Sequence, residues 1–228
     1  MKKSLGLLVL VWLFAWMPHA NAEEIEISAN VTLASDYSFR GWSQTTRDPA
    51  IQGGFDIEFD EGFSLGTWAS NVNFGASTTM EWDLYAGYSS SFNDDVSWSV
   101  SFIRFEYPSE GEALDYIEFG GSVSYMSFTA GLMLSPSYLG EDGPSFQYPY
   151  VDYSKELNDE VTLDLHAGIS MVDEDDFFGD GNDSYIDFSA SLTRSFHGID
   201  VSAAIVGTNL DDNPDTEPRL VVSFSKSM

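Results

Sequence analysis

The stretch from Ile25 to Phe39 alternates mostly apolar and mostly polar side chains at every second position, and this pattern constrains the fold more than any other feature. A two-residue period is that of a β-strand with unlike faces, because successive side chains point to opposite sides of the backbone. Globular strands are usually about five or six residues long, whereas a tilted strand that crosses a bilayer needs about 9–11. We therefore predict one long strand over residues 25–39, of the kind found in membrane barrels.

The same alternation recurs along the chain and predicts twelve strands. Short connections lie near residues 61, 94, 127, 159 and 197, and longer ones cover residues 40–49, 71–79, 108–114, 139–147, 173–183 and 208–217. Short turns at one end, long loops at the other and an even strand number are typical of outer-membrane barrels. We predict an all-β fold, a twelve-stranded antiparallel transmembrane β-barrel with short periplasmic turns, longer extracellular loops and both chain ends on the periplasmic side.

Residues 1–22 have the three parts of a secretory signal peptide: Lys2 and Lys3, an apolar block from Leu5 to Met17, and an Ala-Asn-Ala site that ends at Ala22. The apolar block is short for a membrane-spanning helix, so a retained anchor is the weaker interpretation. We predict cleavage after Ala22 and a mature barrel over residues 23–228 in the outer membrane of a Gram-negative bacterium. No second long apolar run follows, so a membrane form must be a closed barrel with every backbone group paired.

The chain is strongly acidic, with 37 Asp and Glu residues against 9 Lys and Arg residues. This charge repels nucleic acid, which we exclude as a partner. A soluble sandwich or a lipocalin-like barrel is the alternative fold, because its strands also alternate. Long strands and the scarcity of Lys on their polar faces weigh against that alternative. So do aromatic residues near the short turns, as in an interfacial girdle: Phe59, Phe63, Phe92, Trp98, Tyr125, Phe128 and Phe196.

Several motifs lie in the first half of the predicted barrel: SDYSFRGWSQT at residues 35–45, DPAIQGGFD at 48–56, GTWASNV at 66–72 and EWDLYAGY at 81–88. Together they resemble the TorF porin family. The likeness covers roughly residues 30–90 and implies an outer-membrane channel protein without naming a solute. One departure is the end of the chain: such barrels commonly end in an aromatic residue that the assembly machinery reads, whereas Ser-Lys-Ser-Met follows Phe224 here.

We predict a passive, cation-selective pore for small hydrophilic solutes, with no cofactor, metal or catalytic residue. Taking the polar face of each strand as the lumen, carboxylates outnumber cations, and such a lining concentrates cations and repels anions. Glu81 and Asp83 are expected to contribute most, because their strand is well patterned. The predicted pore-lining residues are Glu26, Asp36, Arg40, Asp56, Glu58, Glu81, Asp83, Arg104, Glu118, Asp164, His166 and Asp187, with Asp60, Asp200 and Arg219 as further members.

Other functions stay open at this stage. A structural or adhesive barrel with a plugged lumen would share the same strand pattern, and the acidity could reflect a salty habitat. An enzyme would need a nucleophile, a base and an orienting group within reach, and the mature chain offers only His166 and His197 as bases of that kind. The acidic loop at residues 173–183 is either a solvated loop or a weak divalent-cation site. Expected partners are outer-membrane lipids and lipopolysaccharide, the barrel assembly machinery, and small solutes or cations.

Overall fold

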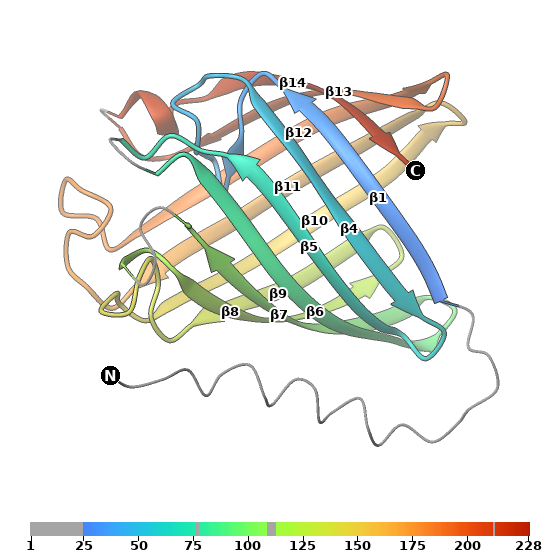
Figure 1. The fold of residues 1–228 in the computed structure, drawn as a ribbon, viewed down its shortest axis with the longest axis horizontal. Helices are drawn as coiled ribbons and strands as arrows, with labels where there is room; N and C mark the ends of the chain where they lie inside the picture. Colours follow the sequence, from blue (N-terminus) through green and yellow to red (C-terminus); the bar gives the residue numbers. More distant parts are fainter. Residues whose placement is uncertain (1–24, 76–77, 109–112, 212) are drawn as a thin grey trace.

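The structure is a computed structural model that describes residues 25–75, 78–108, 113–211 and 213–228, and it forms a closed antiparallel β-barrel (Figure 1). The predicted signal peptide, residues 1–22, lies outside the described residues. The prediction of a twelve-stranded antiparallel barrel is confirmed. The wall consists of β1 (Ile25–Ala34), β4 (Ala50–Phe59), β5 (Phe63–Asn71), β6 (Met80–Asn93), β7 (Val96–Glu106), β8 (Tyr116–Tyr125), β9 (Phe128–Ser135), β10 (Phe146–Asn158), β11 (Val161–Val172), β12 (Ser184–Phe196), β13 (Ile199–Thr208) and β14 (Arg219–Ser227).

The wall closes where the first strand meets the last. β1 pairs with β4 on one side and with β14 on the other, in a register that joins Asn30 to Ser227 and Ala34 to Ser223. Beyond β14, Met228 exchanges two backbone hydrogen bonds of 2.9 and 3.0 Å with Ala29. Because every wall strand has two neighbours, the barrel presents no open sheet edge. Within the described part of the chain, no helix is long and apolar enough to cross a membrane.

The two faces of each strand differ in polarity, as the alternation predicts. On β7, Val100 and Phe102 point outward and are 48% and 37% exposed, whereas Ser99 and Ser101 face the interior. The same division holds along β1, where Ile27 and Leu33 lie outside. Near the short turns the outer surface carries exposed aromatic side chains: Phe63, Phe92, Tyr125, Phe128 and Phe196. The barrel thus has an apolar exterior with a girdle of aromatic side chains at the short-turn end.

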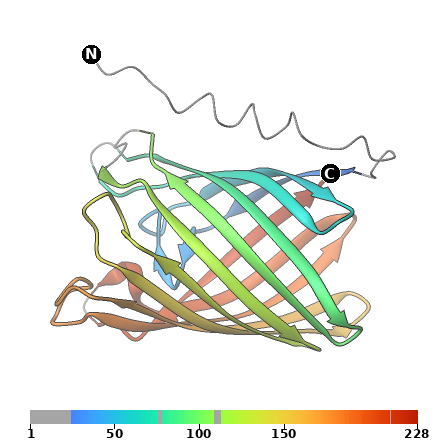
Figure 2. The ribbon, with the colours of Figure 1, turned by 90° about the horizontal axis from the view of Figure 1, so that it is seen from below.

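The first strand ends earlier than predicted. It leaves the wall after Ala34 instead of continuing to Phe39, and the chain turns into the barrel, where β2 (Ser38–Phe39) and β3 (Trp42–Ser43) form a small hairpin (Figure 2). We call residues 35–49 the inner segment. The strand breaks here because the carboxylate of Asp36 is buried inside the barrel, where it accepts hydrogen bonds from several donors instead of facing water. The alternation of residues 35–39 is therefore not that of a wall strand.

Exchanging an outer and an inner residue for Arg tests the assignment of the two faces. Leu165 lies outside near the middle of β11, whereas Ser191 lies inside on β12, opposite Asp164. Leu165→Arg is expected to lower the free energy of unfolding by about 2–4 kcal/mol in a phospholipid bilayer, because it places a charge against lipid. Ser191→Arg should cost much less, since its charge stays beside Asp164. Urea unfolding in vesicles measures both, and equal losses would contradict the assigned faces.

Candidate functional site

The hairpin of the inner segment turns at Arg40 and Gly41. Both residues have positive φ, 49° and 79°, as a two-residue type I′ turn requires. A Cβ atom at Gly41 would lie 2.6 Å from the carbonyl oxygen of Gly207 on β13, so the turn fits closely against the wall. An arginine in the left-handed region costs about 1–2 kcal/mol relative to its ordinary conformation. Such a conformation persists where other contacts hold it, and the side chain of Arg40 makes those contacts.

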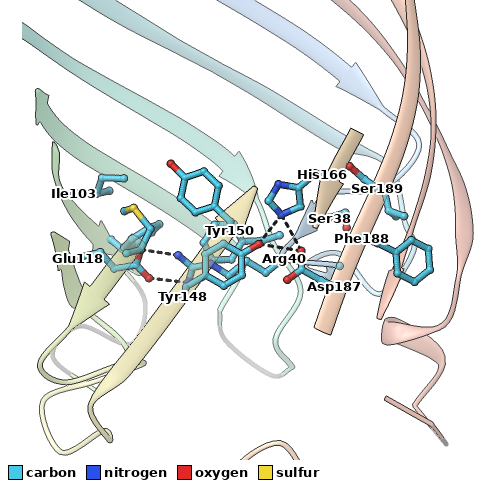
Figure 3. Close-up of a pocket in the computed structure, with 15 residues that line it drawn as sticks. Ser38, Arg40, Ile103, Glu118, Tyr148, Tyr150, His166, Asp187, Phe188 and Ser189 are labelled. Carbon is cyan, nitrogen blue, oxygen red and sulfur yellow. Dashed lines mark hydrogen bonds and ion pairs between the residues drawn. The ribbon is translucent and has the colours of Figure 1, made fainter. Parts of the chain in front are cut away.

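Arg40 reaches across the interior to Glu118 on β8 (Figure 3). Its two Nη atoms donate to the two carboxylate oxygens of Glu118, each at 2.7 Å, and the side chains are only 6% and 0% exposed. The guanidinium also lies over three aromatic rings, those of Phe39, Phe146 and Tyr148, at 4.3 to 4.7 Å. Burial alone would lower the pKa of Arg40, but the Glu118 carboxylate outweighs it and raises that pKa. Arg40 is therefore a fixed cation with one matched carboxylate.

A second ion pair holds the base of the hairpin. Asp36 accepts hydrogen bonds from the hydroxyls of Ser43 and Thr45 and from Nε of Arg219 on β14, at 2.5 to 2.9 Å. Arg219 also donates through Nη1 to the carbonyl oxygen of Gly41 at 2.9 Å. Asp36 and Arg219 are both nearly inaccessible to solvent. The last strand thus binds the inner segment at its start and at its turn.

A third anchor joins the inner segment to β6. Tyr37 donates its hydroxyl to Glu81 at 2.7 Å, and Tyr107, which follows β7, donates to the other carboxylate oxygen at 3.0 Å. Burial and the neighbouring Glu81 carboxylate raise the pKa of both Tyr37 and Tyr107 well above the ordinary value, so both hydroxyls remain donors. The inner segment is thus fastened to β6, β8 and β14, three separate parts of the wall.

His166 is part of a polar network next to Arg40. Its Nδ1 lies 2.5 Å from Asp152, and its Nε2 lies 2.6 Å from the Tyr148 hydroxyl and 3.1 Å from Asp187. Tyr148 in turn donates to Asp187 at 3.0 Å. Both ring nitrogens are therefore occupied by carboxylate or phenol oxygens. Among the described residues, no Ser or Thr hydroxyl is hydrogen-bonded to His166.

The inner segment separates two cavities in the barrel. One, of about 390 Å³, lies inside the barrel and is enclosed by the wall strands. Its lining includes Arg40, Tyr148, Tyr150 and His166 (Figure 3). The other, of about 910 Å³, lies among the long loops and is lined largely by aromatic side chains. We call them the inner cavity and the outer cavity. Phe39 lines both, so the hairpin is the partition between them.

Most residues predicted to line the pore lie on interior rows of the wall strands, and Asp36 and Arg40 lie on the inner segment. The interior set is Glu26, Asp56, Glu58, Glu81, Asp83, Glu118, Asp164, His166 and Asp187. Arg104 departs from the prediction, because it lies on the outward row of β7 and pairs with Glu106 at 2.6 Å and Asp115 at 3.6 Å. Its apolar neighbours Ile103 and Phe105 face inward and line the inner cavity.

The interior carboxylates differ in their exposure. Glu81, Glu118 and Asp187 are at most 2% exposed and lie near the inner segment. By contrast, Glu26 and Glu58 face each other across the β1–β4 pair close to the short-turn end, where both are exposed. Neither Glu26 nor Glu58 has a basic partner in the part of the chain that the structure describes. The same described residues contain no group of three or more His, Asp and Glu side chains placed to hold a metal ion.

Sequence reasoning missed Tyr37, Tyr107, Tyr148 and Asp152. Tyr148 and Asp152 share one face of β10 with Phe146 and Tyr150, so their spacing was a usable signal. Tyr37 gave no such signal, because it occupies an apolar position of the alternating pattern although its hydroxyl bonds to Glu81. Tyr107 lies outside every strand.

Solved structures with the same fold include two porins. The chain aligns with a structure described as the KdgM porin with a TM-score of 0.54 and 12% sequence identity, over 88% of this chain and 99% of that one. The NanC porin aligns with a TM-score of 0.56 and 10% identity, over 88% of this chain and 98% of the other. At these identities the likeness establishes the fold alone. No curated protein sequence matches the chain.

The sequence itself matches one family of proteins. The model of the Gcw_chp family, described as a bacterial protein of unknown function, matches residues 19–228. This match covers the whole barrel and does not include the TorF name, so that resemblance remains a prediction. The chain belongs to the Gcw_chp family.

Proposed function

We propose that this protein is an outer-membrane channel for the passive diffusion of small hydrophilic solutes, with a preference for cations. The observation that carries the proposal is the closed barrel whose exterior is apolar and whose interior is lined by small polar and acidic side chains. Such a wall is stable against lipid on one side and encloses a polar path on the other. The fold likeness to the KdgM and NanC porins is compatible with this function.

The preference for cations follows from the balance of interior charges. Arg40 and Arg219 are each matched by a carboxylate, Glu118 and Asp36, and therefore add no net positive charge. His166 lies between two further carboxylates. Other interior carboxylates that are at least partly exposed have no basic partner among the described residues, and they focus a negative potential in the confined interior: Glu26, Asp56, Glu58, Asp164 and Asp200.

The inner segment limits the size of the solute. Phe39 and Arg40 lie between the inner and outer cavities, and the rings of Phe146 and Tyr148 pack against the guanidinium. This is the narrow part of the proposed path, and it restricts passage to small solutes. The same feature favours a second candidate, a structural or adhesive barrel that the inner segment plugs. In either case we propose outer-membrane lipids and lipopolysaccharide as surroundings and the barrel assembly machinery as a partner.

Reversal potentials across a salt gradient test the charge preference. The wild-type channel is expected to prefer cations, and Glu26→Gln with Glu58→Gln should reduce that preference, because both side chains are exposed in the interior. The control is Glu174→Gln, which removes a carboxylate from an exposed outer loop. Raising the salt should weaken the preference, since the Debye length falls to about 10 Å at 0.1 M and about 3 Å at 1 M. A preference for anions would refute the proposal.

Single-channel recording tests the narrow part. Arg40→Ala combined with Glu118→Gln removes the central ion pair without leaving a buried charge unpaired, and it should raise the conductance at least about twofold. Arg47→Ala is the matched control, because Arg47 lies in the same segment but is exposed and pairs weakly with Glu217 at 3.4 Å. Current from the double variant alone would favour the plugged barrel. Absence of current from every variant would refute the channel.

A further inference from the structure

The outer cavity is a second binding-site candidate, distinct from the narrow part of the barrel. It measures about 910 Å³, a size suited to a small organic molecule. Its wall gathers aromatic side chains from separate elements: β2, β3, β8 and β12, and the outer loops. The aromatic residues among them include Trp42, Tyr138, Phe177, Phe178 and Tyr185.

These rings are in contact with one another around the cavity. Trp42 meets Tyr185 with ring centroids 6.2 Å apart, and Tyr185 meets Phe178 at 4.7 Å. Phe178 then contacts Phe177 at 5.1 Å, which approaches Tyr138 at 6.2 Å. The crossing angles lie between 50° and 89°, so neighbouring rings hold each other at an inclination rather than in one flat stack. Tyr138 and Tyr185 are themselves buried, so the ring surface open to an occupant comes mainly from Trp42, Phe177 and Phe178, which are partly exposed.

The charges at this cavity have one sign. Asp215 is the one charged residue among its lining side chains in the described part of the chain, and no Lys or Arg lines it there. Asp215 belongs to η3 (Pro214–Thr216), which packs against β3, the strand that carries Trp42. The loop at residues 173–183, which supplies Phe177 and Phe178, carries several more carboxylates. An occupant therefore meets aromatic faces and a negative field together.

We propose that the outer cavity binds a small organic cation, of the quaternary ammonium or aromatic amine class. A cation is attracted to the negative face of aromatic rings, and grouped rings are a known means of binding quaternary ammonium groups. The single carboxylate and the acidic loop add to this attraction and disfavour anions. A neutral molecule would gain only the apolar contact. The proposal does not depend on the channel function, because the cavity lies on the outer side of the hairpin.

Isothermal titration calorimetry on the full-length barrel in a neutral detergent tests this with three probes that share one ring: benzyltrimethylammonium, benzyl alcohol and benzenesulfonate. We expect the cation to bind about tenfold more tightly than the alcohol and the sulfonate not to bind. Trp42→Leu keeps an apolar side chain but removes a ring face, and Asp215→Asn removes the charge. Each should weaken binding of the cation several-fold, while Asp215→Asn should leave the affinity for benzyl alcohol unchanged.

Trp98→Leu is the matched control, because Trp98 lies at the opposite, short-turn end of the barrel, where its side chain contacts Phe92 and Tyr88. It should leave the affinity for the cation unchanged. A heat-dependent shift in gel mobility verifies that each variant is a closed barrel before titration. Equal binding of cation and alcohol, binding of the sulfonate, or an equal loss in Trp98→Leu and Trp42→Leu would each overturn the proposal. Because calorimetry needs no current, a failure here is distinguishable from a failure of the channel.

Discussion

The ion pair between Arg40 and Glu118 is the interaction on which the interior arrangement depends. It joins the inner segment to the opposite wall through two hydrogen bonds of 2.7 Å in a region almost closed to solvent. Removing water from two charges is costly, and the attraction between them repays that cost only when both are present in good geometry. Loss of one partner alone from such a pair typically costs about 3–5 kcal/mol. The strained backbone of Arg40 is maintained by the same contacts.

The barrel could be predicted from the sequence because its outer face is apolar and its inner face is polar, so each strand shows apolar and polar residues at alternate positions. Ile27 and Leu33 face outward and Ser28 and Thr32 face inward, as a two-residue period requires. The inner segment could not be predicted in this way. Tyr37 continues the apolar rhythm, yet its partner Glu81 is 44 residues away, and Glu118 is 78 residues from Arg40. Contacts at such separations leave no periodic trace in a single sequence.

Arg104 illustrates the limit of assigning faces by polarity. A polar interior and an apolar exterior hold along most of the wall, but the relation reverses where the inner segment packs. There Ile103 and Phe105 face inward, because Phe39 offers them an apolar partner at 5.8 Å between the ring centroids of Phe39 and Phe105. Arg104 is left on the outer row, near the loops, where it pairs with Glu106 and Asp115. Polarity therefore identifies the interior only where the interior is not filled by protein.

The position of Arg219 gives the inner segment a place in the order of assembly. Asp36 lies two residues after the end of the first wall strand, and its cationic partner Arg219 lies at the start of the last one. While the C-terminal strand is unpaired, the carboxylate of Asp36 has no guanidinium from which to accept a hydrogen bond, and the carbonyl oxygen of Gly41 lacks its donor. Joining β14 to β1 supplies both at once. The complete set of contacts that holds the hairpin therefore exists only in a barrel whose wall is closed, which couples the position of a segment inside the barrel to the pairing of its two terminal strands.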